Sequence, residues 1–261
     1  MKLCLYSGAG NTFVVIDGRE SLPAIDVVGL CSRFGTDGLM VLRSEDDCDF
    51  VMDYFNSDGS GGMMCGNGGR CIVAFADHLG IEPRDGKLYS FRAADGMHTG
   101  EVLQREGVQK TVRLRMIDVT EMYPALDGWF LNTGTRHFVK FVPDVESIDI
   151  QQEGRRYRWD PAFAPVGANA NFVQVSDVLK VRTFEKGVED ETLACGTGIT
   201  ASALAACLNG VAPHSVDGDG RRHYLIRARR DALSVDFLQG SREFTSVYLT
   251  GPTTLVSTEE L

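Results

Sequence analysis

Several features that mark other classes of protein are missing from this chain of 261 residues. Residues 1–8 contain no apolar segment of the kind found in signal peptides, so we expect a protein that is not exported. Basic residues are outnumbered, with 26 Lys and Arg against 36 Asp and Glu. The resulting net charge of -10 argues against a nucleic-acid or anionic-membrane partner. No Cys-x-x-Cys or His-x-x-x-His spacing occurs, so no zinc site is predicted.

One stretch without charged residues, 192–213, resembles a membrane segment in length only. It contains three glycines, several hydroxyls, Asn209 and Pro213, and it has no aromatic residue. This composition predicts a buried core helix of roughly 12 residues rather than a membrane span. The chain has seven cysteines, an odd number, which favours free thiols in a reducing cytoplasm over a disulfide framework.

Two cysteines share the same surroundings, 130 positions apart. Cys65 and Cys195 are each followed by Gly at +1 and +3, and each precedes a run that ends at a glycine at +15. Apolar residues after Cys65 recur at helical spacing (Ile72, Phe75, Ala76 and Leu79), so a helix is predicted to begin at each cysteine. The remaining cysteines, including Cys71 and Cys207, are interpreted as core residues.

Around these two helices the pattern is mainly that of strands, with one further helix at 25–34. We predict strands at 3–6, 13–17, 39–42, 49–55, within 88–117, and at 129–133, 137–142, 155–159, 171–176, 179–184, 222–229, 232–237 and 245–250. A turn at Gly251-Pro252 is expected to lead to a last short strand at 253–257. Two strand-rich halves, each with a helix that begins at a cysteine, predict a duplicated α+β architecture.

The chemistry of such a pair follows from the helix ends. A thiol at a helix N-terminus lies near unpaired backbone N–H groups and the positive end of the helix dipole, which favour its thiolate form. Flanking glycines allow a carboxylate to rest on those amides. We expect the two thiols to face one substrate, one removing an α-proton while the other delivers a proton to the opposite face. No cofactor is expected, because no lysine stands in a setting typical of a Schiff base.

At this point a family can be recognised. The segments 56–60, 64–71 and 191–198 resemble the signatures of diaminopimelate epimerases, and the similarity extends to 8–13 and 168–172. The resemblance implies an enzyme of lysine and peptidoglycan precursor synthesis that interconverts LL- and meso-diaminopimelate without a cofactor. It also implies two pseudo-symmetric α+β domains, each a curved, mostly antiparallel sheet or barrel around a central helix, with the active site in the interdomain cleft. We expect domains at 1–118 (with a C-terminal strand at about 249–261) and 119–248.

The resemblance also implies roles for individual residues. Cys65 and Cys195 correspond to the two acid–base thiols, and His137 and Glu185 to the residues that assist them. Carboxylate and substrate contacts are assigned to Asn11, Asn56, Gly66, Asn67, Thr135, Asn169, Lys186, Gly196 and Thr197. The expected partner is a small amino-acid substrate, with a homodimer as the expected assembly, and no metal is expected.

Two departures from the family pattern concern the far end of the substrate. The family usually has Arg at the position of Lys186 and Asn-Pro where this chain has Thr135-Arg136. Lysine keeps the charge but loses the two-pronged fork that suits a carboxylate, which Arg136 would have to supply.

Three alternatives therefore stay open. The first is a racemase of another amino acid, of the histidine or proline type. The second is a thiol redox protein, against which the absence of a Cys-x-x-Cys partner argues. The third is a non-catalytic amino-acid-binding module, which would not need two activated thiols.

Overall fold

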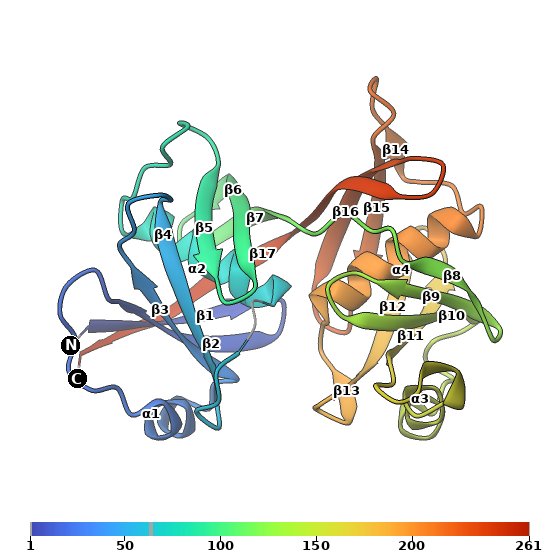
Figure 1. Ribbon diagram of the computed structural model, residues 1–261, viewed down its shortest axis with the longest axis horizontal. Coiled ribbons are helices and arrows are strands. Elements are labelled where there is room, and N and C mark those ends of the chain that lie inside the picture. Colours follow the sequence, from blue (N-terminus) through green and yellow to red (C-terminus); the bar gives the residue numbers. More distant parts are fainter. Residues whose placement is uncertain (1, 63–64, 261) are drawn as a thin grey trace. The chain divides into compact units, whose positions relative to one another are not determined.

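The computed structural model describes residues 2–62 and 65–260, so Met64 of the first cysteine motif and Leu261 at the C-terminus lie outside the described residues. The chain divides into two units (Figure 1). Unit 1 comprises Met1–Arg115 and Thr250–Leu261, and unit 2 comprises Met116–Leu249.

Unit 1 is a closed ring of strands. Each strand is hydrogen-bonded to the next, and β17 pairs with both β7 and β1, which closes the ring. Closure leaves none of the eight strands with an exposed edge. The members are β1 (Lys2–Gly8), β2 (Asn11–Asp17), β3 (Gly38–Arg43), β4 (Phe50–Asn56), β5 (Tyr89–Ala93), β6 (Gly96–Glu106), β7 (Gln109–Arg115) and the end of β17 (Phe244–Glu260).

The helix α2 (Gly66–His78) is the central helix of this unit. It packs against β1, β2, β3, β6 and β7, and its residues 66–76 are all buried. The shorter helix α1 (Val27–Phe34) begins where Asp26 accepts a hydrogen bond from Gly29 N and packs against β2 and β3 through Leu30 and Cys31. Of these two described helices, only α2 is therefore enclosed by strands, and its N-terminus carries Cys65.

Unit 2 repeats the same order of pairings. Its strands are β8 (Met122–Ala125), β9 (Gly128–Asn132), β10 (Arg136–Phe141), β11 (Asn169–Val175), β12 (Leu179–Glu185), β13 (Asp190–Thr192), β14 (Ser215–Val216), β15 (Arg222–Arg227), β16 (Ala232–Gln239) and the start of β17. Pairings from β9 to β16 alternate antiparallel, parallel, antiparallel, parallel, antiparallel, as they do from β1 to β6. The predicted duplicated α+β fold is confirmed.

The second central helix, α4 (Gly196–Leu208), occupies the place in unit 2 that α2 has in unit 1. It packs against β9, β10, β11, β12, β15 and β16, and its residues 198–207 are buried. Two hydroxyls inside this apolar setting return to the helix itself, from Thr200 to Gly196 O and from Ser202 to Gly198 O. Because those polar groups are satisfied, the helix can be enclosed on every side. Within the described residues, no helix has the length and apolar sequence needed to cross a membrane.

Two details of the expected secondary structure are wrong. Residues 155–159 are not a strand, because α3 (Ile150–Arg158) covers most of them, followed by a 3-10 turn at Pro161–Phe163. Asp149 accepts hydrogen bonds from Gln151 N and Gln152 N and so starts this helix, whose buried Tyr157 mimicked an alternating strand. No turn occurs at Gly251-Pro252 either, because pairing with β7 keeps β17 continuous past the proline.

Candidate active site

Cys65 lies at the N-terminus of the buried helix in unit 1. It is the N-cap residue of α2, and Gly68 N donates to its Sγ at 3.2 Å while Gly69 N donates to its carbonyl oxygen at 2.8 Å. The amides of Gly66 and Asn67 precede these two and are the predicted carboxylate donors. The thiol therefore takes the place that a Ser or Asp side chain has in an ordinary helix cap, and it stays half-buried.

Beside this thiol, a short chain of hydrogen bonds joins three polar residues. Arg70, which is fully buried, donates to Asn67 Oδ1 at 2.8 Å and to Gly66 O at 3.1 Å. Asn67 Nδ2 in turn donates to Asn11 Oδ1 at 2.6 Å. Asn11 follows the two-residue turn between β1 and β2, where Ala9 and Gly10 both have positive φ. The orientation of the Asn11 amide is therefore set from inside the unit.

Asn56 ends β4, directly before the turn that leads toward Cys65. Its Nδ2 donates to Ser60 Oγ at 2.9 Å and its backbone N donates to Ser60 O. Asp58 tightens the same turn by accepting from Ser60 N. The cluster of turn-forming residues at 56–62 thus forms a hydrogen-bonded turn, as its composition predicts.

Cys195 holds the corresponding N-cap position in unit 2, but its side chain makes no hydrogen bond to the cap amides as that of Cys65 does. It is the N-cap residue of α4, Ile199 N donates to its carbonyl oxygen at 2.8 Å, and it is 7% exposed. Its Sγ lies 3.4 Å from Thr197 Oγ1. The predicted carboxylate donors Gly196 and Thr197 occupy the first turn, as Gly66 and Asn67 do in α2.

His137 is buried next to this helix end. Its Nε2 lies 2.8 Å from Thr135 Oγ1 and 3.0 Å from Thr197 Oγ1, and the two hydroxyls are 3.0 Å apart. Burial lowers the pKa of His137 to about 3, so the imidazole is neutral in neutral solution. Thr133 Oγ1 fixes the same turn by donating to Thr197 O. The histidine is therefore tied to Cys195 through one hydroxyl.

Glu185 and Lys186 lie where β12 turns toward β13. Glu185 is the half-buried last residue of β12, and the exposed Lys186 donates its backbone N–H to Asn169 Oδ1 at 2.7 Å. Asn169 Nδ2 donates to Arg136 O, so both ends of this amide are engaged.

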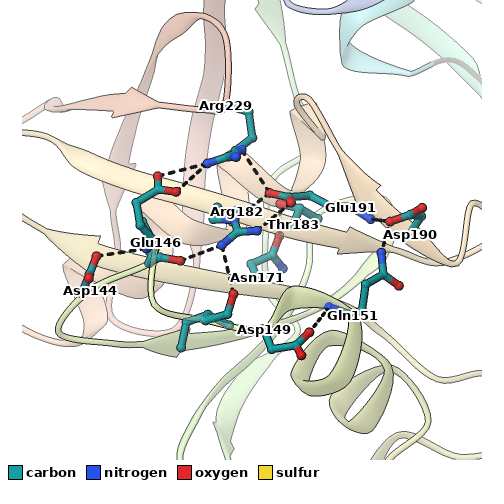
Figure 2. Close-up of polar contacts among 12 residues, drawn as sticks. Asp144, Glu146, Asp149, Gln151, Asn171, Arg182, Thr183, Asp190, Glu191 and Arg229 are labelled. Atoms are coloured by element: carbon teal, nitrogen blue, oxygen red, sulfur yellow. Dashed lines mark hydrogen bonds and ion pairs between the residues drawn. The ribbon is translucent and has the colours of Figure 1, made fainter.

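A network of ion pairs stabilises the hairpin formed by β12 and β13. Arg182 of β12 donates two 2.7 Å hydrogen bonds to Glu191, and Arg229 contacts both Glu191 and Glu146 (Figure 2). Arg182 is nearly buried and also donates to Val145 O. The network holds the segment between Lys186 and Cys195 against its own sheet.

Sequence comparison then identifies the family. The sequence profile described as "Diaminopimelate epimerase" matches residues 3–111 and 129–253. This chain belongs to the diaminopimelate epimerase family. The diaminopimelate epimerase of Flavobacterium psychrophilum is 37% identical over 98% of each chain. That of Chlorobaculum tepidum is 38% identical, covering 94% of this chain and 95% of its own.

Solved structures of lower sequence similarity share the fold. A Bacillus anthracis protein of the PhzF family, named for phenazine biosynthesis, matches with a TM-score of 0.75 at 12% identity, covering 100% of this chain and 98% of its own. A probable proline racemase from Agrobacterium radiobacter matches with a TM-score of 0.67 at 16% identity, covering 100% and 92%. At such identities the likeness concerns the architecture alone.

The predicted site residues are divided between the two units. Unit 1 holds Asn11, Asn56, Cys65, Gly66 and Asn67, and unit 2 holds Thr135, His137, Asn169, Glu185, Lys186, Cys195, Gly196 and Thr197. Arg136 does not join them. Its guanidinium donates to Phe163 O and lies 5.1 Å from the centre of the Phe130 ring, because successive residues of β10 point to opposite faces. The expectation that Arg136 supplies a carboxylate fork is therefore not supported.

The sequence reasoning missed two groups that contact site residues. Asn171 Nδ2 lies within hydrogen-bond distance of His137 Nδ1, and Arg70 donates a hydrogen bond to Asn67 Oδ1. The sequence did hold a sign of Asn171, since Asn169 and Asn171 occupy alternate positions in a mostly apolar strand and so share one face.

The other five cysteines do not cap either of the two helices. None of the seven cysteines, all of which lie in the described part of the chain, forms a disulfide, and the five outside the site are buried. Burial raises the pKa of Cys71 to about 12, which makes it an inert core residue. Among residues 2–62 and 65–260, no group of three or more His, Cys, Asp or Glu is arranged to hold a metal ion.

Proposed function

We propose that this chain interconverts LL- and meso-diaminopimelate by a two-base proton transfer between Cys65 and Cys195. The observation that carries the proposal is the repeated cap: two units with the same strand order each present one cysteine as the N-cap of their central buried helix. Family membership supplies the substrate and the place of the reaction in lysine and peptidoglycan precursor synthesis.

In the proposed reaction, the thiolate of one cysteine removes the α-proton, so an S–H bond forms as the C–H bond breaks. The electron pair spreads into the substrate carboxylate. The other cysteine then gives its proton to the opposite face of the same carbon, and its sulfur becomes the thiolate. The reverse reaction exchanges the two roles.

The amides at the two helix ends would stabilise the charge that develops on the carboxylate. Gly66 and Asn67 supply such donors in unit 1, and Gly196 and Thr197 supply them in unit 2. Loss of a single preorganised donor typically reduces a rate by about 10²–10³-fold. We assign Asn11, Asn56, Asn169 and Lys186 to the rest of the substrate, and Glu185 to the assistance of a thiol.

Deuterium exchange tests this proposal directly. Purified, reduced protein in heavy water should replace one α-hydrogen of diaminopimelate, which NMR or mass spectrometry detects. Cys65→Ala and Cys195→Ala should each abolish epimerisation, whereas Cys207→Ala, in the same helix as Cys195, should retain it. Wild-type rates in either of the first two variants would exclude the two-base mechanism. Exchange of proline or histidine instead of diaminopimelate would show that the substrate is wrong.

The cellular setting belongs to the same proposal. We infer a cytoplasmic homodimer, and the seven free thiols support a reducing compartment. Sedimentation equilibrium of the reduced protein measures the assembly, and a monomer at micromolar concentration would contradict it.

A further inference from the structure

The orientation of Asn171 is fixed at both ends of its amide. Its Nδ2 donates to Phe138 O at 2.9 Å, and a carbonyl oxygen can only accept. Its Oδ1 accepts from Thr183 Oγ1 at 2.9 Å, and Figure 2 shows these two residues beside each other. Both contacts agree on which end of the Asn171 amide is the NH₂ group.

The fixed NH₂ group faces the ring of His137. Asn171 Nδ2 lies 3.1 Å from His137 Nδ1. A nitrogen that receives a hydrogen bond carries no proton of its own, so a neutral His137 has its proton on Nε2. Asn169 Nδ2 lies 3.5 Å from His137 Nε2, but both nitrogens are then donors, so this contact is not a hydrogen bond. Asn169 Nδ2 donates to Arg136 O instead.

The proton on Nε2 points toward hydroxyl groups. Nε2 lies within 3.0 Å of the hydroxyls of both Thr135 and Thr197, and Thr197 Oγ1 lies 3.4 Å from Cys195 Sγ. A thiolate only accepts hydrogen bonds, so Thr197 must donate to Cys195 when the sulfur is charged. Thr197 Oγ1 is then left to accept, either from His137 directly or through the hydroxyl of Thr135.

We propose that Asn171 is a positioning residue: it holds His137 as the Nε2–H tautomer, and the imidazole then donates through the threonine hydroxyls toward the thiolate of Cys195. No proton changes place in this arrangement; the histidine orients donors and does not itself act as a base. The kinetic part of the inference rests on the proposed function, whereas the tautomer does not.

The backbone builds this arrangement through strand register. His137 lies opposite Asn169 in β10–β11, and Asn171 lies opposite Thr183 in β11–β12, so these side chains share the face that α4 covers. Gly198 in the first turn of α4 makes the approach close. A Cβ at that position would collide with Asn171 Oδ1 and lie 3.2 Å from His137 Cε1.

Nitrogen NMR of the reduced, full-length protein labelled with ¹⁵N-histidine reads the tautomer directly. The His137 signals are assigned by their loss in His137→Gln. The expected spectrum has an unprotonated Nδ1 and a protonated Nε2. A proton on Nδ1 in the wild-type protein would overturn the proposal whatever the enzyme catalyses.

The decisive variant is Asn171→Asp, which replaces the donor by a carboxylate that accepts from Nδ1–H. Nδ1 should become protonated, and kcat for epimerisation should fall on the order of 10²-fold. KM should stay within about threefold, because Asn171 does not touch the substrate. An unchanged tautomer, or a wild-type kcat with a protonated Nδ1, would overturn the proposal.

Two further variants complete the test. Gln174→Glu makes the same chemical change in the same strand, where the side chain contacts Val145 N, and it should change neither readout. Thr183→Val keeps the shape but removes the donor to Asn171 Oδ1. If Asn171→Asp does not fold, Thr183→Val should give a mixture of both tautomers with a partial loss of kcat. A spectrum of Thr183→Val identical to that of the wild type would contradict the proposal that the orientation of the Asn171 amide sets the His137 tautomer.

Alkylation separates this proposal from the proposed function. Peptide mass spectrometry follows the rate at which iodoacetamide labels Cys195, a rate that depends on its thiolate. If wild-type protein epimerises no amino acid, the proposed function fails, yet Asn171→Asp should still slow the labelling of Cys195 relative to Gln174→Glu. Equal labelling rates would overturn the inference itself.

Discussion

Asn67 Nδ2 donates to Asn11 Oδ1 over 2.6 Å, joining the first turn of α2 to the turn between β1 and β2. The bond is directional, because Arg70 donates to Asn67 Oδ1 and thereby fixes which end of that amide faces Asn11. The Asn11 oxygen is turned inward, and its NH₂ group lies at the opposite end of the same planar amide. Through Asn67, the buried Arg70 thus fixes the orientation of Asn11, a residue assigned to substrate binding.

Asn11→Asp should therefore weaken substrate binding while it preserves the fold. The carboxylate still accepts from Asn67 Nδ2, but the NH₂ donor is lost and a negative charge is gained. We expect KM for diaminopimelate to rise on the order of 10²-fold, since hydrogen bonds to charged groups contribute about 1.5–3 kcal/mol. Steady-state kinetics with both stereoisomers measure the change.

Asn11→Ala separates the effect of losing the NH₂ donor from the effect of adding a negative charge. It removes the donor without adding a charge, so its KM should lie between those of the wild type and Asn11→Asp. A KM for Asn11→Asp equal to that of the wild type would show that the amide of Asn11 faces no substrate group.

The two helices that begin at Cys65 and Cys195 could be predicted from the sequence, because they depend on local patterns. The helical spacing of apolar residues after Cys65, and the matching glycines after Cys65 and Cys195, predicted the two helix ends from local sequence alone. Residues 155–159, at the end of α3, were misread as a strand because their two aromatic residues, Tyr157 and Trp159, alternate with arginines, a pattern too short to separate a strand from a helix. Contacts such as Asn171 with His137 depend on strand register, which links residues 34 positions apart and which no local pattern encodes.

Gly198→Ala should destabilise unit 2 by about 1–3 kcal/mol, the usual range for an overpacked site. The added Cβ would meet Asn171 Oδ1 and the His137 ring, so one of them must move. Urea unfolding followed by circular dichroism measures the loss, and the histidine spectrum should change with it.

Gly218→Ala is the matched control in the same unit. A Cβ at Gly218 meets no atom within 4 Å, so its unfolding midpoint should equal that of the wild type. Equal midpoints for both variants would show that the first turn of α4 has more room than its contacts indicate.

Asp77 at the end of α2 predicts an acid-sensitive contribution to stability. Burial raises its pKa, but hydrogen bonds from Arg105 and Lys110 outweigh burial and lower it to about 2. Because the folded-state pKa lies below the unfolded value, the stabilisation is complete above about pH 4 and disappears as the pH falls through about 2. Allowing for screening at the exposed Arg105, Asp77→Asn should lose about 1 kcal/mol at neutral pH.

Chemical unfolding at several pH values checks this sign. The gap between wild type and Asp77→Asn should be constant from pH 7 to about 5 and should shrink below about pH 4. Asp47→Asn, whose side chain is 84% exposed, is the control and should show no gap. A gap that grew with acidity would contradict the assignment.

Lys186→Arg tests whether the far end of the substrate is a carboxylate. Lys186 is exposed, and its backbone is anchored by the bond to Asn169 Oδ1, so an arginine can replace it without disturbing the hairpin. Arginine offers two parallel donors where lysine offers a point charge, so KM for diaminopimelate should fall roughly 3–10-fold with kcat unchanged. Lys186→Met should raise KM, and Lys180→Arg in the same unit should leave it unaltered. If Lys186→Met instead epimerises diaminopimelate as well as the wild type does, the charge at this position does not select the distal carboxylate, and the substrate is recognised elsewhere.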